Sequence, residues 1–232
     1  MNAILLAAGL GSRFKEVTKN NHKALLPVGG VPNIERTIQY LKEYGVEDIV
    51  IVVGYMAHLF DYLIEKYQVK LIVNEHYADY NNLYSMYCAL DELNDSIVID
   101  ADVVLLDQIF PQLGKSGYFT IQRSKSNDLE WCPRVVDGRV VAMDITDEFR
   151  PSMLGISYWN HEDCGKIKDE VNRRMKIEEN YQNPKLYWDN IPVDLLDELD
   201  VTTYPIDERL VNEMDTVENY QETLKKFEEM KK

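Results

Sequence analysis

Residues 3–13 read Ala-Ile-Leu-Leu-Ala-Ala-Gly-Leu-Gly-Ser-Arg. The apolar half shows no polar alternation, which predicts a strand buried on both faces, as in a parallel sheet. The turn that follows contains Gly9 and Gly11, which permit positive φ and leave backbone N–H groups uncovered for a phosphate. Arg13 adds a planar fork of donors for phosphate oxygens. The stretch therefore predicts an α/β fold whose first strand leads into a phosphate-binding loop.

The same glycine spacing also makes ordinary strand-to-helix turns, so by itself it is a weak signal. The loop lacks the third glycine of a dinucleotide-binding motif and the Gly-Lys-Ser/Thr of a P-loop, which argues against both classes. A second motif, Asn-His-Lys-Ala-Leu-Leu-Pro-Val-Gly-Gly, occupies residues 21–30. The two motifs together favour a nucleotide site over a plain turn, and a phosphate-binding role for Lys23 over that of a solvated loop lysine.

The segments after these motifs alternate between helix and strand patterns. Residues 33–44 have helical spacing and end at Gly45, and residues 57–67 also indicate a helix. The β-branched stretches 48–53 and 70–73 indicate buried strands. This order predicts a Rossmann-like three-layer α/β/α sandwich with a mostly parallel sheet, in which ligands lie outside the carboxyl ends of the strands.

The pattern changes between residues 115 and 155, where short alternating segments surround an Asp137-Gly138 hairpin turn. A strand at 153–159 and a helix from residue 162 then return to the α/β pattern. The length of 232 residues suits one domain with a modest insertion. We therefore expect a single domain over residues 1–232, with a small β insertion at about 115–155.

The amino-acid composition limits which binding partners and which cellular compartment we expect for the protein. A formal net charge of −15 disfavours nucleic acid and anionic membranes, which are bound through basic surfaces. A phosphorylated substrate must then be held by local cations, with a divalent metal ion to help. The three cysteines are widely spaced and suggest neither disulfides nor a zinc site. The apolar start, residues 3–10, is too short for a signal peptide or a membrane span, so we expect a cytoplasmic protein.

Two carboxylates follow a buried strand in Ser-Ile-Val-Ile-Asp-Ala-Asp, residues 96–102. The period of two puts Asp100 and Asp102 on the same side of an ideal strand, at its carboxyl end. Carboxylates in such a place sometimes only cap the next turn. Together with substrate phosphates, however, they offer the hard oxygen ligands that Mg²⁺ prefers, and we favour a metal site here.

Other polar and aromatic side chains leave two interpretations open. Tyr187, Trp188 and Asp189 put two aromatic rings beside a carboxylate, which suits a quaternary ammonium group, yet the rings can equally pack in the core and Asp189 can cap a helix. Glu130 and Trp131 lie in the β insertion, where a tryptophan is more often packing than ligand.

Five stretches carry a resemblance to a known family. They are Ala-Ala-Gly-Leu-Gly-Ser-Arg at 7–13, Tyr-Ala-Asp-Tyr-Asn-Asn-Leu-Tyr-Ser at 77–85, Ile-Asp-Ala-Asp at 99–102, Leu-Tyr-Trp-Asp-Asn at 186–190 and Met-Asp-Thr-Val-Glu-Asn-Tyr at 214–220. With the lysine motif, the chain resembles the bacterial CTP:phosphocholine cytidylyltransferases of the NTP transferase superfamily over nearly its whole length.

The resemblance implies roles for individual residues. Arg13 and Lys23 become the catalytic cations on the phosphates, and Asp102 and Asp215 the ligands of Mg²⁺, although Asp215 also suits a helix N-cap. The loop at 74–85 approaches the base, although Asn81 or Asn82 also suits a helix cap. The nucleotide site comprises Leu6, Ala8, Gly9, Gly11, Ser12, Arg13, Lys23, Tyr80, Asn82, Ser85 and Asp100. The acceptor site comprises Trp131, Tyr187, Asp189 and Glu213.

The resemblance further implies in-line attack by a phosphate oxygen of phosphocholine on the α-phosphorus of CTP, which yields CDP-choline and pyrophosphate. No general base is required, because the attacking phosphate is already ionised at pH 7. The chain departs from the family pattern at His22, where a proline is frequent, and at residues 14–17. The acceptor therefore stays open between phosphocholine and 2-aminoethylphosphonate, with a sugar 1-phosphate or a non-catalytic CTP sensor as weaker alternatives.

Overall fold

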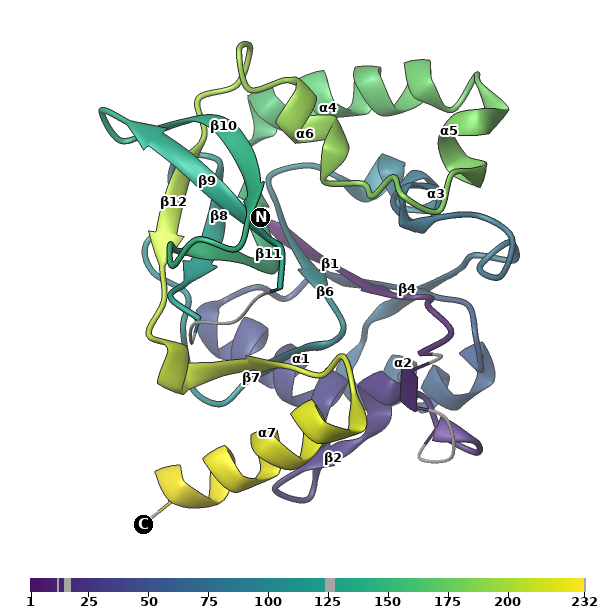
Figure 1. Ribbon diagram of the computed structural model, residues 1–232. Helices are drawn as coiled ribbons and strands as arrows, with labels where there is room; N and C mark the ends of the chain where they lie inside the picture. The colour runs from purple at the N-terminus through teal and green to yellow at the C-terminus, as the bar shows by residue number, and fades with distance from the viewer. Residues whose placement is uncertain (12, 15–17, 124–127, 232) are drawn as a thin grey trace.

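A computed structural model of the chain describes residues 1–11, 13–14, 18–123 and 128–231. Its centre is a seven-stranded sheet (Figure 1). The strands lie in the order β12 (Thr202–Pro205), β8 (Gly117–Ile121), β11 (Ser152–Trp159), β6 (Ser96–Asp100), β1 (Asn2–Ala7), β4 (Ile49–Val53) and β5 (Lys70–Val73). Strand β11 runs antiparallel to β6 and β8, and the other neighbouring pairs in the sheet are parallel. The predicted mostly parallel sheet is confirmed.

Helices cover both faces of this sheet, as predicted (Figure 1). They are α1 (Asn33–Tyr44), α2 (Tyr62–Tyr67), α3 (Asn82–Cys88), α4 (His161–Arg174), α5 (Glu178–Gln182), α6 (Asn190–Asp194) and α7 (Val217–Met230). Single 3-10 turns occur at η2 (Lys23–Leu25), η3 (Ala57–Phe60), η4 (Leu90–Glu92) and η5 (Glu208–Leu210).

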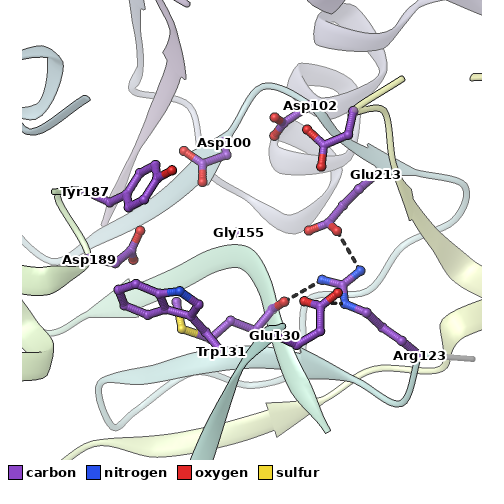
Figure 2. Close-up of a pocket in the computed structure, with 11 residues that line it drawn as sticks. Asp100, Asp102, Arg123, Glu130, Trp131, Gly155, Tyr187, Asp189 and Glu213 are labelled. Carbon is purple, nitrogen blue, oxygen red and sulfur yellow. Dashed lines mark hydrogen bonds and ion pairs between the residues drawn. The ribbon is translucent and has the colours of Figure 1, made fainter. Parts of the chain in front are cut away.

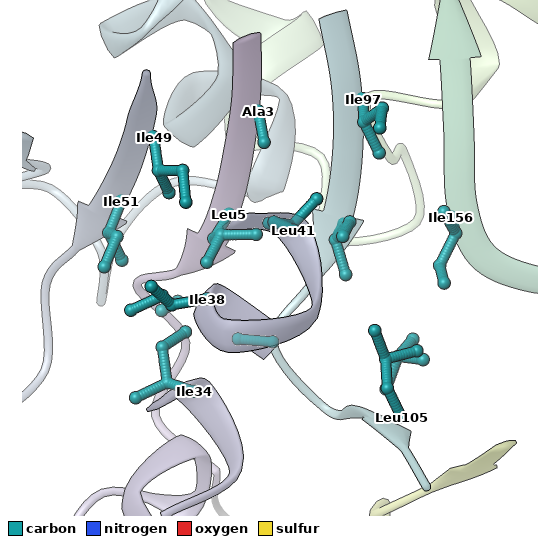
Figure 3. Packing of buried hydrophobic residues seen from close by; sticks show 14 of the residues in the cluster. Ala3, Leu5, Ile34, Ile38, Leu41, Ile49, Ile51, Ile97, Leu105 and Ile156 are labelled. Atoms are coloured by element: carbon teal, nitrogen blue, oxygen red, sulfur yellow. The ribbon is translucent and has the colours of Figure 1, made fainter. Parts of the chain in front are cut away.

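The apolar start of the chain forms the middle of the core. Alternate residues of β1 point to opposite faces, so Leu5 packs with α1 while Ile4 packs with α3 and α4. Ile34, Ile38 and Leu41 recur at helical spacing and form the face of α1 against the sheet (Figure 3). Truncating a fully buried residue such as Ile38 to alanine typically costs about 2–5 kcal/mol of stability.

Three small sheets surround the main one. They are β2 (Pro27–Val28) with β3 (Val31–Pro32), β7 (Val103–Leu105) with β13 (Val211–Glu213), and β9 (Glu130–Val136) with β10 (Arg139–Thr146). The β9–β10 pair is a hairpin whose turn residues both have positive φ, as the Asp137-Gly138 pair predicted. Helix α7 packs through Phe227 and Tyr220 on the segment around β2, which brings the C-terminal part of the chain near the N-terminal motifs.

Two details differ from the expectation. Residues 117–121, which the predicted insertion at about 115–155 included, belong to the main sheet as β8, because they pair with β11 and β12. Strand β6 ends at Asp100, so Asp102 lies in the turn before β7 and not on the strand.

The order of the strands also fixes where a ligand can enter. From β1 the chain proceeds to β4 and β5 on one side, and then returns to β6 on the other side of β1. A crevice opens at such a switch point, outside the carboxyl ends of the strands. Here those ends are Ala7 of β1 and Asp100 of β6.

Candidate active site

The turn after β1 borders a cavity at the carboxyl end of the sheet, which Ala8 and Gly9 line. Two of its carbonyl oxygens are hydrogen-bonded, since Ala8 O accepts a bond from Tyr55 N (3.1 Å) and Gly11 O accepts one from Phe14 N (3.0 Å). Within the described part of the chain, the N–H groups of Gly9, Leu10 and Gly11 have no hydrogen-bond partner. Successive backbone N–H groups that are not hydrogen-bonded within the protein can bind an anion such as a phosphate. The predicted residue Ser12 lies outside the described residues.

His22 fixes this turn to the lysine motif. Its Nδ1 accepts a bond from Ala24 N (3.1 Å), so the proton is on Nε2, which donates to Gly9 O (3.0 Å). Burial lowers the pKa of His22 to about 4, and the ring is therefore neutral at pH 7. His22, which stands where the family often has proline, thus links the two motifs. The sequence analysis did not predict this role.

A cavity of about 200 Å³, which we call the nucleotide-side cavity, opens beside this turn. It is lined by Leu6, Ala7, Ala8, Gly9, His22, Lys23, Asn82, Ser85, Asp100, Ala101, Asp102 and Tyr187. Most of the predicted nucleotide residues are among them. The aliphatic part of Lys23 packs beside Gly11, which has φ of +59°.

Tyr80 takes a different place from the one predicted for the nucleotide site. Its ring stacks on His76 (centroids 4.7 Å apart) and contacts Tyr181 (4.7 Å), and it is not among the residues that line either cavity described here. Ser85 does line the nucleotide-side cavity, and its hydroxyl accepts a bond from Asn74 Nδ2 (3.0 Å).

Each predicted phosphate-binding cation is paired with a predicted metal ligand. Lys23 Nζ lies 2.7 Å from Asp102 Oδ2, and Arg13 Nη2 lies 2.7 Å from Asp215 Oδ1. Asp215 is not the cap of α7, because Thr216 is the N-cap and forms a capping box with Asn219. The carboxylate of Asp215 is therefore left to face Arg13 and the site.

A second cavity of about 250 Å³, the acceptor-side cavity, meets the first at Asp100, Asp102 and Tyr187 (Figure 2). Its lining comprises Asp100, Asp102, Arg123, Glu130, Trp131, Met153, Gly155, Tyr187, Asp189, Glu213 and Asp215. All four predicted acceptor residues and both predicted metal ligands line this cavity.

Two aromatic rings form one wall of the acceptor-side cavity. The rings of Trp131 and Tyr187 lie edge to face, with centroids 6.4 Å apart. Trp188 does not join them, because its side chain is only 1% exposed and packs edge to face on Trp159. For Trp188 the core interpretation is therefore correct, whereas Tyr187 and Asp189, its neighbours, face the cavity.

Arg123 holds the opposite wall together and was missed by the sequence reasoning. Its guanidinium pairs with Glu213 (Nη1 to Oε2, 2.6 Å) and Glu130 (Nε to Oε2, 3.2 Å), as Figure 2 shows. It also donates to Ser152 Oγ (2.8 Å) and Met153 O (2.7 Å). These contacts join β9, β11 and β13, which lie far apart in the sequence.

The acceptor-side cavity carries more negative than positive charge. Burial and then the charge of Asp102 raise the pKa of Asp100 well above its usual range. Burial raises the pKa of Asp189 to about 7, and that of Glu213 to about 7 against the opposing effect of Arg123. A positive charge nearby would stabilise the ionised form of these buried carboxylates. The cavity is therefore suited to a cationic ligand.

Gly155 brings β11 close to Asp100. The residue has φ of +66°, and a Cβ built on it would lie 3.2 Å from Asp100 Oδ2. The pairing of β11 with β8 shifts register between Met153 and Ser157, around this glycine. A larger residue would displace Asp100, so the glycine preserves the space where the two cavities meet.

The carboxylates can accommodate a divalent metal ion only together with other ligands. Within the described residues, no group of three or more His, Cys, Asp or Glu side chains is arranged to hold one. Mg²⁺, however, is commonly held by one or two carboxylates plus substrate phosphates and water. Asp102 and Asp215 at the mouth of an acidic cavity offer that kind of oxygen donor set.

A glycine turn at the switch point, a lysine beside it and carboxylates at the neighbouring strand end form the arrangement that the sequence analysis predicted. The sequence profile of the MobA-like NTP transferase domain matches residues 3–113. The choline-phosphate cytidylyltransferase of Haemophilus influenzae is 44% identical over 98% of this chain and 97% of its own length. The 2-aminoethylphosphonate cytidylyltransferase of Lancefieldella rimae is 34% identical over 93% and 89%, respectively.

Among solved structures, the CTP:phosphocholine cytidylyltransferase of Streptococcus pneumoniae superposes with a TM-score of 0.90 at 38% identity, covering 97% of each chain. On these similarities the chain belongs to the family of the bacterial choline-phosphate cytidylyltransferases. Its fold, predicted as a Rossmann-like α/β sandwich, is that of this family. Over the described residues, none of the helices has the length and apolar character to cross a membrane.

Proposed function

We propose that the protein transfers the cytidylyl group of CTP to phosphocholine and releases pyrophosphate. The observation that carries the proposal is the meeting of two chemically different cavities at Asp100, Asp102 and Tyr187. One cavity borders free backbone N–H groups and Lys23, which suit phosphates, and the other is aromatic and acidic, which suits an ammonium group. A phosphate that joins the two substrates would lie at their junction.

The ion pairs of the free enzyme exchange partners in this mechanism. Lys23 leaves Asp102 for the α-phosphate, and Arg13 leaves Asp215 for the β- and γ-phosphates. The two carboxylates are then available to a divalent cation, for which we propose Mg²⁺, and the metal ion would neutralise charge on the phosphates. The chain's own contribution is to position the phosphates and stabilise their charge.

On the acceptor side, Trp131 and Tyr187 present ring surfaces and Asp189 a carboxylate to the quaternary ammonium. On the nucleotide side, Asn82 and Ser85 are the proposed contacts of the base. The β9–β10 hairpin, within the insertion at about 115–155 of a single domain, then forms the acceptor wall. We propose the cytoplasm as the location, since Cys88, Cys132 and Cys164 are all free thiols.

A second candidate acceptor, 2-aminoethylphosphonate, is favoured by the acidic lining. Its primary ammonium needs hydrogen-bond acceptors rather than ring faces, and Asp100, Asp189 and Glu213 supply them. The relative from Lancefieldella rimae carries the name of this activity. The two candidates share the mechanism and differ only in how the ammonium group is bound.

The test is pyrophosphate release from CTP and Mg²⁺ with phosphocholine, 2-aminoethylphosphonate and glucose 1-phosphate supplied separately. Selective turnover with phosphocholine is the expected result. Selectivity for the phosphonate would replace the acceptor and keep the mechanism. CTP binding without release of pyrophosphate in any arm would contradict the proposed function.

A further inference from the structure

Two consecutive asparagines at the start of α3 bind a distant stretch of the chain, residues 180–189, which we call the acceptor segment. Asn81 Nδ2 donates to the carbonyl oxygens of Asn180 and Asn183, both at 2.8 Å. The backbone N–H of Asn81 donates to Tyr181 O, also at 2.8 Å. Helix α5, where the segment starts, lies beside α3 (Figure 1). Asn81 thus makes three hydrogen bonds to one short stretch about 100 residues away.

Asn82 adds a fourth bond and connects the segment to the nucleotide-side cavity. Its Oδ1 accepts from Trp188 N at 2.8 Å, while the residue itself lines that cavity. Trp188 is flanked by Tyr187 and Asp189, which line the acceptor-side cavity. The two asparagines therefore determine how the acceptor residues lie relative to the nucleotide site.

Much of the acceptor segment is exposed, and one further bond, from Asn180 Nδ2 to Arg174 O, ties it to the end of α4. Helix α5 buries none of its residues, and Pro184 and Lys185 are exposed. Trp188 is the buried anchor at one end, and Tyr181 contacts the rings of Tyr80 and Tyr84 at the other. Between these anchors, the amide of Asn81 sets the path of the backbone.

Asn81 does not serve α3 as a helix cap. It occupies the N-cap position, but its side chain makes no capping hydrogen bond. Its Oδ1 is buried without a hydrogen-bond partner, which has a free-energy cost. The hydrogen bonds that the Asn81 side chain does make are therefore the two that its Nδ2 donates to the acceptor segment.

We propose that Asn81 is a positioning residue for acceptor binding, acting through the acceptor segment on Tyr187 and Asp189. The inference rests on the proposed function only in that an acceptor binds between Trp131, Tyr187 and Asp189. Asn81 lines neither cavity and touches no substrate in this arrangement. Its loss should therefore affect acceptor binding while CTP binding is preserved.

The test compares Asn81→Ala with Asn2→Ala as a matched control. Asn2 Nδ2 also donates to a distant backbone carbonyl, that of Glu92 (2.7 Å), but Asn2 lies at the start of β1 and lines neither cavity. The KM values for CTP and phosphocholine come from pyrophosphate release, and phosphocholine binding without CTP is measured by isothermal titration calorimetry. We expect Asn81→Ala to raise the KM and Kd for phosphocholine about tenfold, through loss of two hydrogen bonds, with the KM for CTP within about twofold.

The control Asn2→Ala should leave both KM values within about twofold of the wild type. If Asn81→Ala does not fold, Asn81→Ser keeps a good N-cap residue and gives up the reach to both carbonyls. An equal rise in both KM values, the same split in Asn2→Ala, or a lowered melting temperature with unchanged acceptor binding would each overturn the inference.

The wild-type measurements separate this inference from the proposed function. If the wild type prefers 2-aminoethylphosphonate, the same comparison is made with that acceptor and with its own KM. A wild type that turns over no acceptor contradicts the proposed function, whatever the variants do. An active wild type whose Asn81 variants bind the acceptor normally contradicts the positioning role alone.

Discussion

The two cavities that meet at Asp100 differ in how their charges are balanced. On the nucleotide side Lys23 is paired with Asp102, and next to it Arg13 with Asp215. On the acceptor side Arg123 is paired with both Glu130 and Glu213. Asp100 and Asp189 have raised pKa values, and neither forms an ion pair among the residues that the structure describes. The first arrangement can release cations to phosphates, whereas the second is ready to receive a cation.

The cavities also differ in construction. The nucleotide side is made at the carboxyl ends of β1 and β6, where a parallel sheet brings turns together. The acceptor side is assembled from a hairpin, an antiparallel strand, the acceptor segment and β13. We infer that the nucleotide side supplies the common chemistry of the fold and that the acceptor side determines which substrate is used.

The largest effect should come from the nucleotide side. Lys23→Ala removes the cation proposed for the α-phosphate, and we expect kcat to fall by about a hundredfold or more. Pyrophosphate release measures the loss, and circular dichroism checks the fold. Lys42→Ala, which breaks only a surface pair with Glu47, is the matched control and should keep normal turnover. If Lys23→Ala folds and keeps a normal kcat, the idea that the nucleotide side supplies cations to the phosphates is contradicted.

The next effect concerns the cation of the acceptor side. Arg123→Met leaves Glu130 and Glu213 without their partner, and the free energy of unfolding should fall by about 1–3 kcal/mol. Urea denaturation measures the change. Adding Glu213→Gln removes one of the unpaired charges and should restore part of the stability. No recovery in the double variant would show that the ion pair is not the cause.

A smaller effect separates the two candidate acceptors. Trp131→Leu removes a ring face, and the KM for phosphocholine should rise about 3- to 30-fold. The KM for 2-aminoethylphosphonate, whose ammonium is held by carboxylates, should change less. Trp131→Phe keeps a ring and serves as the conservative control. Equal losses for both acceptors would mean that the ring shapes the cavity without binding the quaternary ammonium.

The smallest effect is on the pH dependence of stability. Burial raises the pKa of Asp189 to about 7 in the folded protein, so the native state binds more protons than the unfolded state between about pH 4 and pH 7. Stability from this group is present at low pH and is lost as the pH rises through 7. Asp189→Asn should therefore gain about 1 kcal/mol at pH 8, reduced by partial exposure, and nothing at pH 4. A gain that is the same at both pH values would contradict the assignment.

Local patterns in the sequence were enough to predict much of the fold. Helix α1 and strand β5 have the predicted bounds, and Gly45 ends α1 with φ of +97°, because periodicity and capping act over a few residues. The antiparallel direction of β11 depends on its pairing with β6 and β8. Such long-range pairing leaves no signal in the strand's own residues.

The same distinction holds for the site. Lys23 and Asp102 were assigned to one site because both match motifs of the resembled family, and the structure brings them together since their motifs follow the neighbouring strands β1 and β6. Arg123 was missed because its partner Glu213 is 90 residues away and Arg123 itself lies in no recognisable motif. Trp188 and Tyr187 are adjacent and alike in chemistry, so only the packing on Trp159 shows which of them is in the core.

The central place of β1 also bears on how the chain is made by the ribosome. The first strand pairs with β4 and β6, so its partners are complete only when about residue 100 has been synthesised. Asp189, Glu213 and Asp215 follow about 90 to 115 residues later, and β12 closes the edge of the sheet in the same interval. We therefore expect the nucleotide half to form during translation before the acceptor half, so that a nascent chain contacts CTP before it can use an acceptor.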